Sequence, residues 1–167
     1  MPDRTASDIA LRGGTLSRVW LDGEALTRLS PLLEADRAQA VHDLLHENRF
    51  APVRPSGDGP FVLRLSITEG RLAFDIRDAE DAPLHLVALA LGPFRRLIKD
   101  YQMLVDSHMM AVQEGREARI QAIDMGRRGL HNEGAQLLVD RLAGKIVIDF
   151  PTARRLFTLV CVLHQRH

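Results

Sequence analysis

The sequence contains one cysteine, Cys161, so the chain cannot form an internal disulfide bond. This argues against a small secreted domain held together by cross-links and favours a reducing, cytoplasmic location. The cysteine lies within the apolar run Leu156–Leu163, where burial disfavours the thiolate. We therefore expect a slowly reacting structural thiol rather than a catalytic nucleophile.

Long apolar runs are also absent. The longest, Leu84–Leu91 and Leu156–Leu163, hold about eight residues each, whereas a transmembrane helix needs roughly 18. The segment Met1–Asp8 is polar, contains two acidic residues and lacks the apolar core of a signal peptide. We expect no membrane-spanning segment and no membrane partner.

Neither sign of charge is in excess, because 22 Lys and Arg residues balance 22 Asp and Glu residues. No overall basic field is therefore available to attract nucleic acid or anionic lipid, and any anion site must be local. A hydrophobic content of 46% and a charged content of 26% are typical of globular proteins. At 167 residues we expect a flexible tail over residues 1–14 and a single domain over residues 15–167.

In the first half of the chain, runs of alternating apolar and polar residues predict strands, and one segment predicts a helix. Ser30 and Pro31 are a helix cap and a first helical residue, and this helix should reach about Asn48. Two alternating runs separated by Glu69 and Gly70 predict a β-hairpin over residues 61–78. The remaining predicted segments are a strand at 16–21, a loop at 51–60 and a strand at 84–91 covered on both faces.

The second half is mainly helical. Pro93 begins a helix that ends at Gly115, and another helix begins near Glu117. Glycines at 126, 129 and 134 predict interruptions in this second helix, which then continues to about Leu142. A short strand at 146–149 and a last helix from Pro151 follow. The predicted fold is α+β, with a mainly antiparallel sheet and four or five helices packed on one face.

Four segments resemble an uncharacterised bacterial family, number 262 of the UPF series. The resemblance implies a small bacterial cytoplasmic protein, and the family has no assigned activity, so no catalytic residue is carried over. The segments are FDIRD (74–78), LGPFRRLIKDY (91–101), AIDMGRRGLHNEGA (122–135) and DFPTARRLFTLVCVLH (149–164).

The densest group of polar side chains lies at residues 124–133. If this segment is helical, Arg127 falls within an apolar stripe, and a buried guanidinium needs a carboxylate or a bound anion. Asp75, Asp78 or Glu133 could supply the carboxylate. An internal ion-pair network of this kind would leave the protein with a non-catalytic, assembly role.

If the segment is instead a loop, GRRG at 126–129 has the GxxG form by which KH domains clamp a nucleic-acid backbone. Cations in the first turn of the helix after Pro93 also oppose the helix dipole, which suggests a secondary anion patch. The leading hypothesis is a binding module for an RNA backbone or phosphate ligand, without a cofactor. The expected contacts are Arg127, Arg128, His131 and Asn132, with Arg95, Arg96 and Lys99 as the secondary patch.

An enzyme is the alternative. His131 near Asp124 and Glu133 could act as a general acid or base, although no nucleophile accompanies it. His42 and His46 are spaced to share a metal ion, but no third ligand appears at a recognisable spacing. We therefore expect no metal site.

Overall fold

The structure is a computed structural model that describes residues 14–22, 30–54 and 59–165. The expected flexible tail at residues 1–14 lies, except for Gly14, outside the described residues. In chain order the elements are β1 (Leu16–Leu21), α2 (Pro31–His46), β2 (Phe50–Pro52), β3 (Phe61–Thr68), β4 (Arg71–Arg77), β5 (Pro83–Ala90), the 3₁₀ turn η1 (Gly92–Phe94), α3 (Arg95–Glu114), α4 (Glu117–Leu142), β6 (Ile146–Ile148) and α5 (Phe150–His164).

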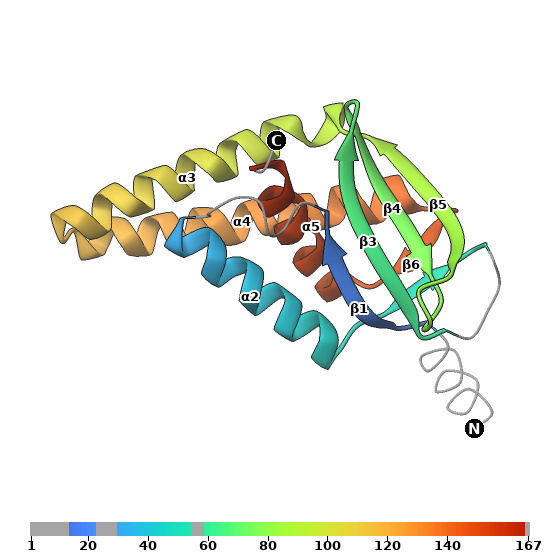
Figure 1. Cartoon of the computed structure of the whole chain (residues 1–167). Coiled ribbons are helices and arrows are strands. Elements are labelled where there is room, and N and C mark those ends of the chain that lie inside the picture. The colour runs from blue at the N-terminus through green and yellow to red at the C-terminus, as the bar shows by residue number, and fades with distance from the viewer. Residues whose placement is uncertain (1–13, 23–29, 55–58, 166–167) are drawn as a thin grey trace, which may run out of the picture.

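Four strands form one sheet in the order β1-β3-β4-β5 (Figure 1). β3 and β4 are the predicted hairpin, and its turn residues Glu69 and Gly70 both adopt the positive φ that a tight hairpin requires. β5 pairs antiparallel with β4, whereas β1 pairs parallel with β3 at the other edge. The α+β prediction is confirmed, and the sheet is mixed rather than purely antiparallel.

The last helix, α5, is the centre of the hydrophobic core. Every residue from Leu156 to Leu163 is buried, and the helix packs against α4, α2 and β3. Figure 1 shows α5 enclosed between the sheet and the other helices. A helix that is apolar on nearly all sides must be buried on nearly all sides, and the burial expected for the apolar run Leu156–Leu163 is confirmed.

A second, two-stranded sheet joins β2 to β6 in antiparallel register, with Phe50 opposite Ile148. The prediction of a loop over the whole of residues 51–60 is therefore wrong at its first residues. Pro52 made that segment resemble a loop, but both strands of a two-stranded sheet are edge strands, where proline is tolerated.

The prediction that the strand near residues 84–91 is covered on both faces is also wrong. Val87 and Leu89 of β5 are buried, while Leu86 is 61% exposed and Leu84 is 38% exposed. β5 is an edge strand, and its alternate side chains point away from the helix-covered face of the sheet.

α4 runs without interruption from Glu117 to Leu142, so the predicted glycine breaks are wrong. GRRG lies inside this helix, and the loop that a KH-type clamp needs is not formed. Tertiary packing overrides the low helix propensity of glycine. A Cβ on Gly134 would lie 2.2 Å from the ring of Phe157, and one on Gly126 would lie 3.4 Å from Leu104. Gly134 therefore permits close packing of α4 against α5, whereas a methyl group at Gly126 would make an ordinary van der Waals contact.

We predict opposite effects of alanine at two glycines of α4. Gly134→Ala should destabilise the fold by about 1–3 kcal/mol, because Phe157 is fully buried and its ring has no room to move. Gly129→Ala, where a Cβ meets nothing within 4 Å, should stabilise it by about 0.5–1 kcal/mol. Urea midpoints measure both effects, and a stabilised Gly134→Ala variant would contradict the packing argument.

Candidate functional site

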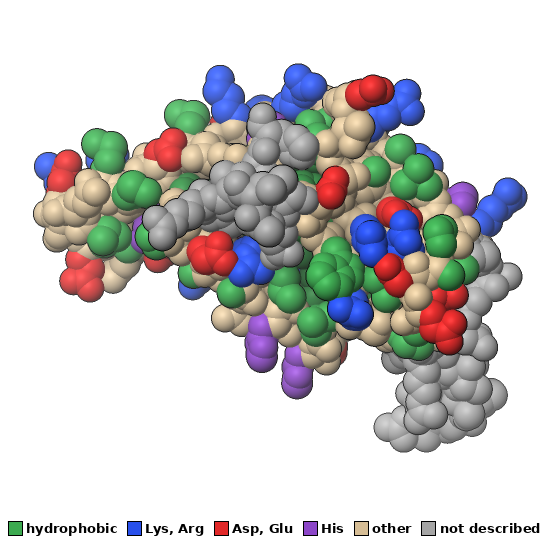
Figure 2. All heavy atoms as spheres, viewed as in Figure 1, with side chains coloured by type: hydrophobic (Ala, Val, Ile, Leu, Met, Phe, Trp, Pro, Cys, Tyr) green, Lys and Arg blue, Asp and Glu red, His purple; other side chains and the backbone are tan. Residues whose placement is uncertain are grey.

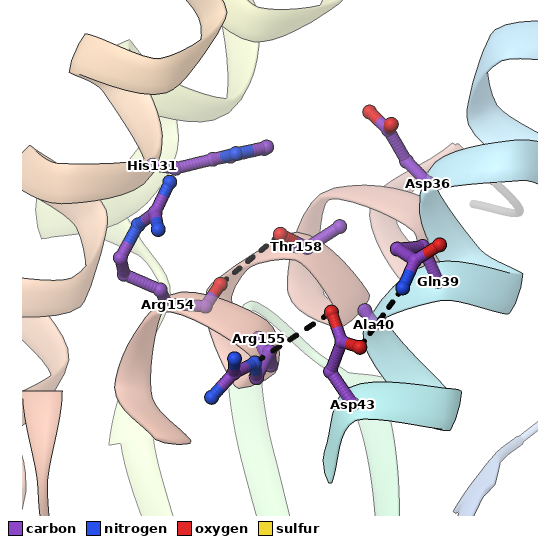
Figure 3. A pocket seen from close by; sticks show the side chains of 8 residues that line it. All are labelled: Asp36, Gln39, Ala40, Asp43, His131, Arg154, Arg155 and Thr158. Atoms are coloured by element: carbon purple, nitrogen blue, oxygen red, sulfur yellow. Dashed lines mark hydrogen bonds and ion pairs between the residues drawn. The ribbon is translucent and has the colours of Figure 1, made fainter. Parts of the chain in front are cut away.

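A half-open cavity of about 180 Å³ lies between α2, α4 and α5. Its lining is polar and comes from three helices that are distant in sequence, as Figure 3 shows. The lining residues are Asp36, Gln39, Ala40 and Asp43 of α2, His131 of α4, and Arg154, Arg155 and Thr158 of α5.

Asp36 joins three helices at the back of this cavity. Its side chain is 14% exposed, and it accepts a short hydrogen bond from the hydroxyl of Tyr101 on α3. The same carboxylate forms an ion pair with Arg127 of α4, with 3.4 Å between Oδ2 and Nε. Burial and the neighbouring Asp36 raise the pKa of Tyr101 far above its ordinary value, so the phenol stays protonated and donates.

His131 forms the α4 side of the cavity. Its ring lies 5.3 Å from the ring of Tyr101, between centroids. Burial, with the positive charges of Arg127 and Arg154, lowers the pKa of His131 from 6.5 to about 4, so the imidazole is neutral at pH 7. Its Nε2 atom is buried and makes no hydrogen bond within the described part of the chain.

Arg154 lies next to His131 at the start of α5 (Figure 3). Its Nε atom is buried and also lacks a hydrogen-bond partner among the described residues. The neighbouring Arg155 is different, because its Nε lies 3.9 Å from Oδ2 of Asp43. Two residues of the cavity lining, from two helices, thus each carry a buried nitrogen whose hydrogen-bonding capacity the described residues do not use.

The residues predicted as ligand contacts separate into two groups. His131 lines the cavity, and Arg127 lies behind it in an internal network with Asp36 and Asp124. The predicted carboxylate partners Asp75, Asp78 and Glu133 do not pair with Arg127. Its carboxylates come from Asp124 of the same helix and from Asp36 of α2, whose position the sequence did not reveal. The other predicted contacts are exposed and do not line the cavity: Arg128, Asn132, Arg95, Arg96 and Lys99.

The predicted acid-base group is not assembled around His131. Asp124 pairs with Arg127, with 3.0 Å between Oδ1 and Nη1, and Glu133 pairs with Arg96 at 3.2 Å. Within the described residues, neither carboxylate hydrogen-bonds to the imidazole. The order of residues along α4 places Glu133 on its exposed side, two positions beyond His131.

Sequence reasoning missed the α2 and α5 sides of the cavity, although signals for both were present. Asp36 lies between Leu33 and Ala40 on the apolar face of its helix, where an unpaired acid would be costly. Arg154 and Arg155 lie in the second turn of α5, directly before the apolar run that begins at Leu156, where guanidinium groups near the core need polar partners.

Two other predicted absences concern metals and membranes. In the described residues no group of three or more His, Cys, Asp or Glu side chains is arranged to bind a metal ion. His42 and His46 stack on the exposed side of α2 with 6.5 Å between ring centroids. Over the same described ranges, no helix combines the length and apolar character needed to cross a membrane.

The low pKa of His131 predicts a specific pH dependence of stability. Between about pH 4 and 6.5 the unfolded chain protonates this imidazole while the folded chain does not, so stability falls as the pH falls through that window. From pH 7 to about pH 5 the loss from this group should be on the order of 2 kcal/mol.

The variant His131→Gln should lose that part of the pH dependence, whereas His42→Gln, on the exposed side of α2, should retain it. Urea unfolding at the two pH values measures the difference. Equal pH dependence in wild type and His131→Gln would contradict the burial of a neutral imidazole.

Comparisons with known proteins agree along nearly the whole chain. The uncharacterised protein family UPF0262 matches residues 14–166. A UPF0262 protein of Granulibacter bethesdensis is 70% identical over 158 residues, covering 90% of each chain, and one of Acidiphilium cryptum is 60% identical over 153 residues, covering 92% of this chain and 94% of that protein. No solved structure shows significant similarity. The resemblance seen in the sequence is confirmed, and the chain belongs to the bacterial UPF0262 family.

Proposed function

We propose that this protein is a non-catalytic binding module for a small anion, held in the cavity between α2, α4 and α5. The observation that carries the proposal is that two residues lining one cavity, Arg154 and His131, each have a buried side-chain nitrogen, Nε and Nε2, without a hydrogen-bond partner in the described residues. Buried polar groups are almost always hydrogen-bonded, so two unpartnered nitrogens on residues of one cavity suggest an external acceptor. Both can donate, the guanidinium as a permanent cation and the neutral imidazole through an Nε2 proton.

A carboxylate or phosphate group suits these donors better than an RNA backbone does. The cavity is small and bounded by side chains of three helices, whereas a polymer backbone needs an extended basic track. Over the face in Figure 2, Lys and Arg side chains are interspersed with Asp and Glu. The GRRG segment also lies within α4 rather than in a clamp loop.

Binding is favoured over acid-base catalysis by the pKa of His131. A general base works best when its pKa lies near the working pH, and a group with a pKa of about 4 accepts protons poorly at pH 7. The same low pKa suits a neutral hydrogen-bond donor. The cavity lining also contains Thr158, but its hydroxyl donates to the backbone oxygen of Arg154, 3.0 Å away. We also expect a cytoplasmic location, which the single, fully buried Cys161 favours.

Titration calorimetry with inorganic phosphate and with acetate tests the proposal. Wild type should bind at least one of them, with affinity that falls as salt rises, and Arg154→Gln should weaken that binding at least tenfold. Arg128→Gln is the matched control, because it removes an exposed arginine of α4 outside the cavity and should bind as wild type does.

Thermal melts of both variants establish that the proteins compared are folded. Absence of binding by wild type to either anion, or equal binding by wild type and Arg154→Gln, would overturn the proposal.

A further inference from the structure

The cavity carries opposite charges on its two sides. His131, Arg154 and Arg155 come from α4 and α5, while Asp36 and Asp43 come from α2 and face them across the cavity (Figure 3). A site for a simple anion needs only the side formed by α4 and α5. A carboxylate within the same small cavity would repel such an anion.

The two aspartates differ in how strongly their carboxylate oxygens are already bound by other side chains. Asp36 is engaged by Tyr101 and Arg127, and its role is structural. Asp43 accepts a hydrogen bond on Oδ1 from Gln39 at 2.8 Å, and its Oδ2 forms only a long ion pair with Arg155, 3.9 Å from Nε and beyond hydrogen-bond distance. The Asp43 side chain is 33% exposed, so Oδ2 is available to a cation in the cavity.

We infer that the ligand is a small zwitterion, with an anionic group at Arg154 and His131 and an ammonium group at Asp43. This rests on the proposed function and adds the second half of the ligand. The cavity of about 180 Å³ has room for a molecule the size of an amino acid. Aminocarboxylates and aminoalkyl phosphates share the required chemistry.

Probe molecules that carry both charged groups, or only one of them, test the anionic and the ammonium contacts separately. For the carboxylate class, β-alanine is compared with propanoate and ethylamine; for the phosphate class, O-phosphoethanolamine is compared with ethyl phosphate. Calorimetry on the full chain should show that the zwitterion of at least one class binds at least tenfold more tightly than its matched anion. The class with the larger preference identifies the anionic group.

Variants at position 43 test the assigned contact. Asp43→Asn should reduce the preference for the zwitterion to about one, without weakening the matched anion, while Arg154→Gln should weaken both. Asp140→Asn is the matched control: Asp140 accepts from Gln136 at 2.9 Å in the same i, i+4 arrangement as Asp43 and Gln39, but lies on exposed α4 surface outside the cavity.

The outcomes separate this inference from the proposed function. Anions that bind as tightly as their zwitterions, or a preference that survives Asp43→Asn, would overturn the zwitterion and leave the anion site standing. Failure of every probe would overturn both. If Asp43→Asn does not fold, the wild-type comparison of zwitterion with anion decides, because it needs no variant.

Discussion

The burial of α5 on all sides is the constraint on which the rest of this fold depends. From Leu156 to Leu163 the helix has no exposed face, so the sheet, α2 and α4 are all positioned by contact with it. Apart from His164 at its end, the polar side chains of α5 lie between Thr152 and Thr158. Arg154, Arg155 and Thr158 meet α2 and α4 there, and the candidate cavity lies where those polar side chains reach the surface of the core.

Asp36 links the helices around that cavity through charge rather than apolar contact. A carboxylate that is 14% exposed requires strong donors, and Tyr101 of α3 and Arg127 of α4 provide them. Tyr101 has no exposed surface and needs an acceptor for its hydroxyl in turn. The three groups satisfy one another, which fixes the spacing of α2, α3 and α4 behind the cavity.

The fold could be predicted from the sequence further than the site could. Local signals placed the hairpin, the Ser30 cap of α2 and the apolar α5, because each depends on residues close together in the chain. The predicted break at Gly134 was wrong because the role of this glycine depends on Phe157, which is distant in sequence. Of the cavity residues only His131 was singled out, since Asp43 and Arg154 become neighbours through the packing of α2 on α5.

The contact between Gly134 and Phe157 also sets the alignment of the cavity. His131 precedes Gly134 by three positions, and Arg154 precedes Phe157 by three, so each cavity residue lies almost one helical turn from the contact. A slip of one residue along α4 would move His131 by about 1.5 Å and turn it by about 100° around the helix axis. The absence of a Cβ at Gly134 therefore fixes the axial register between α4 and α5. The relative position of His131 and Arg154 is thus determined by a contact that contains no polar atom.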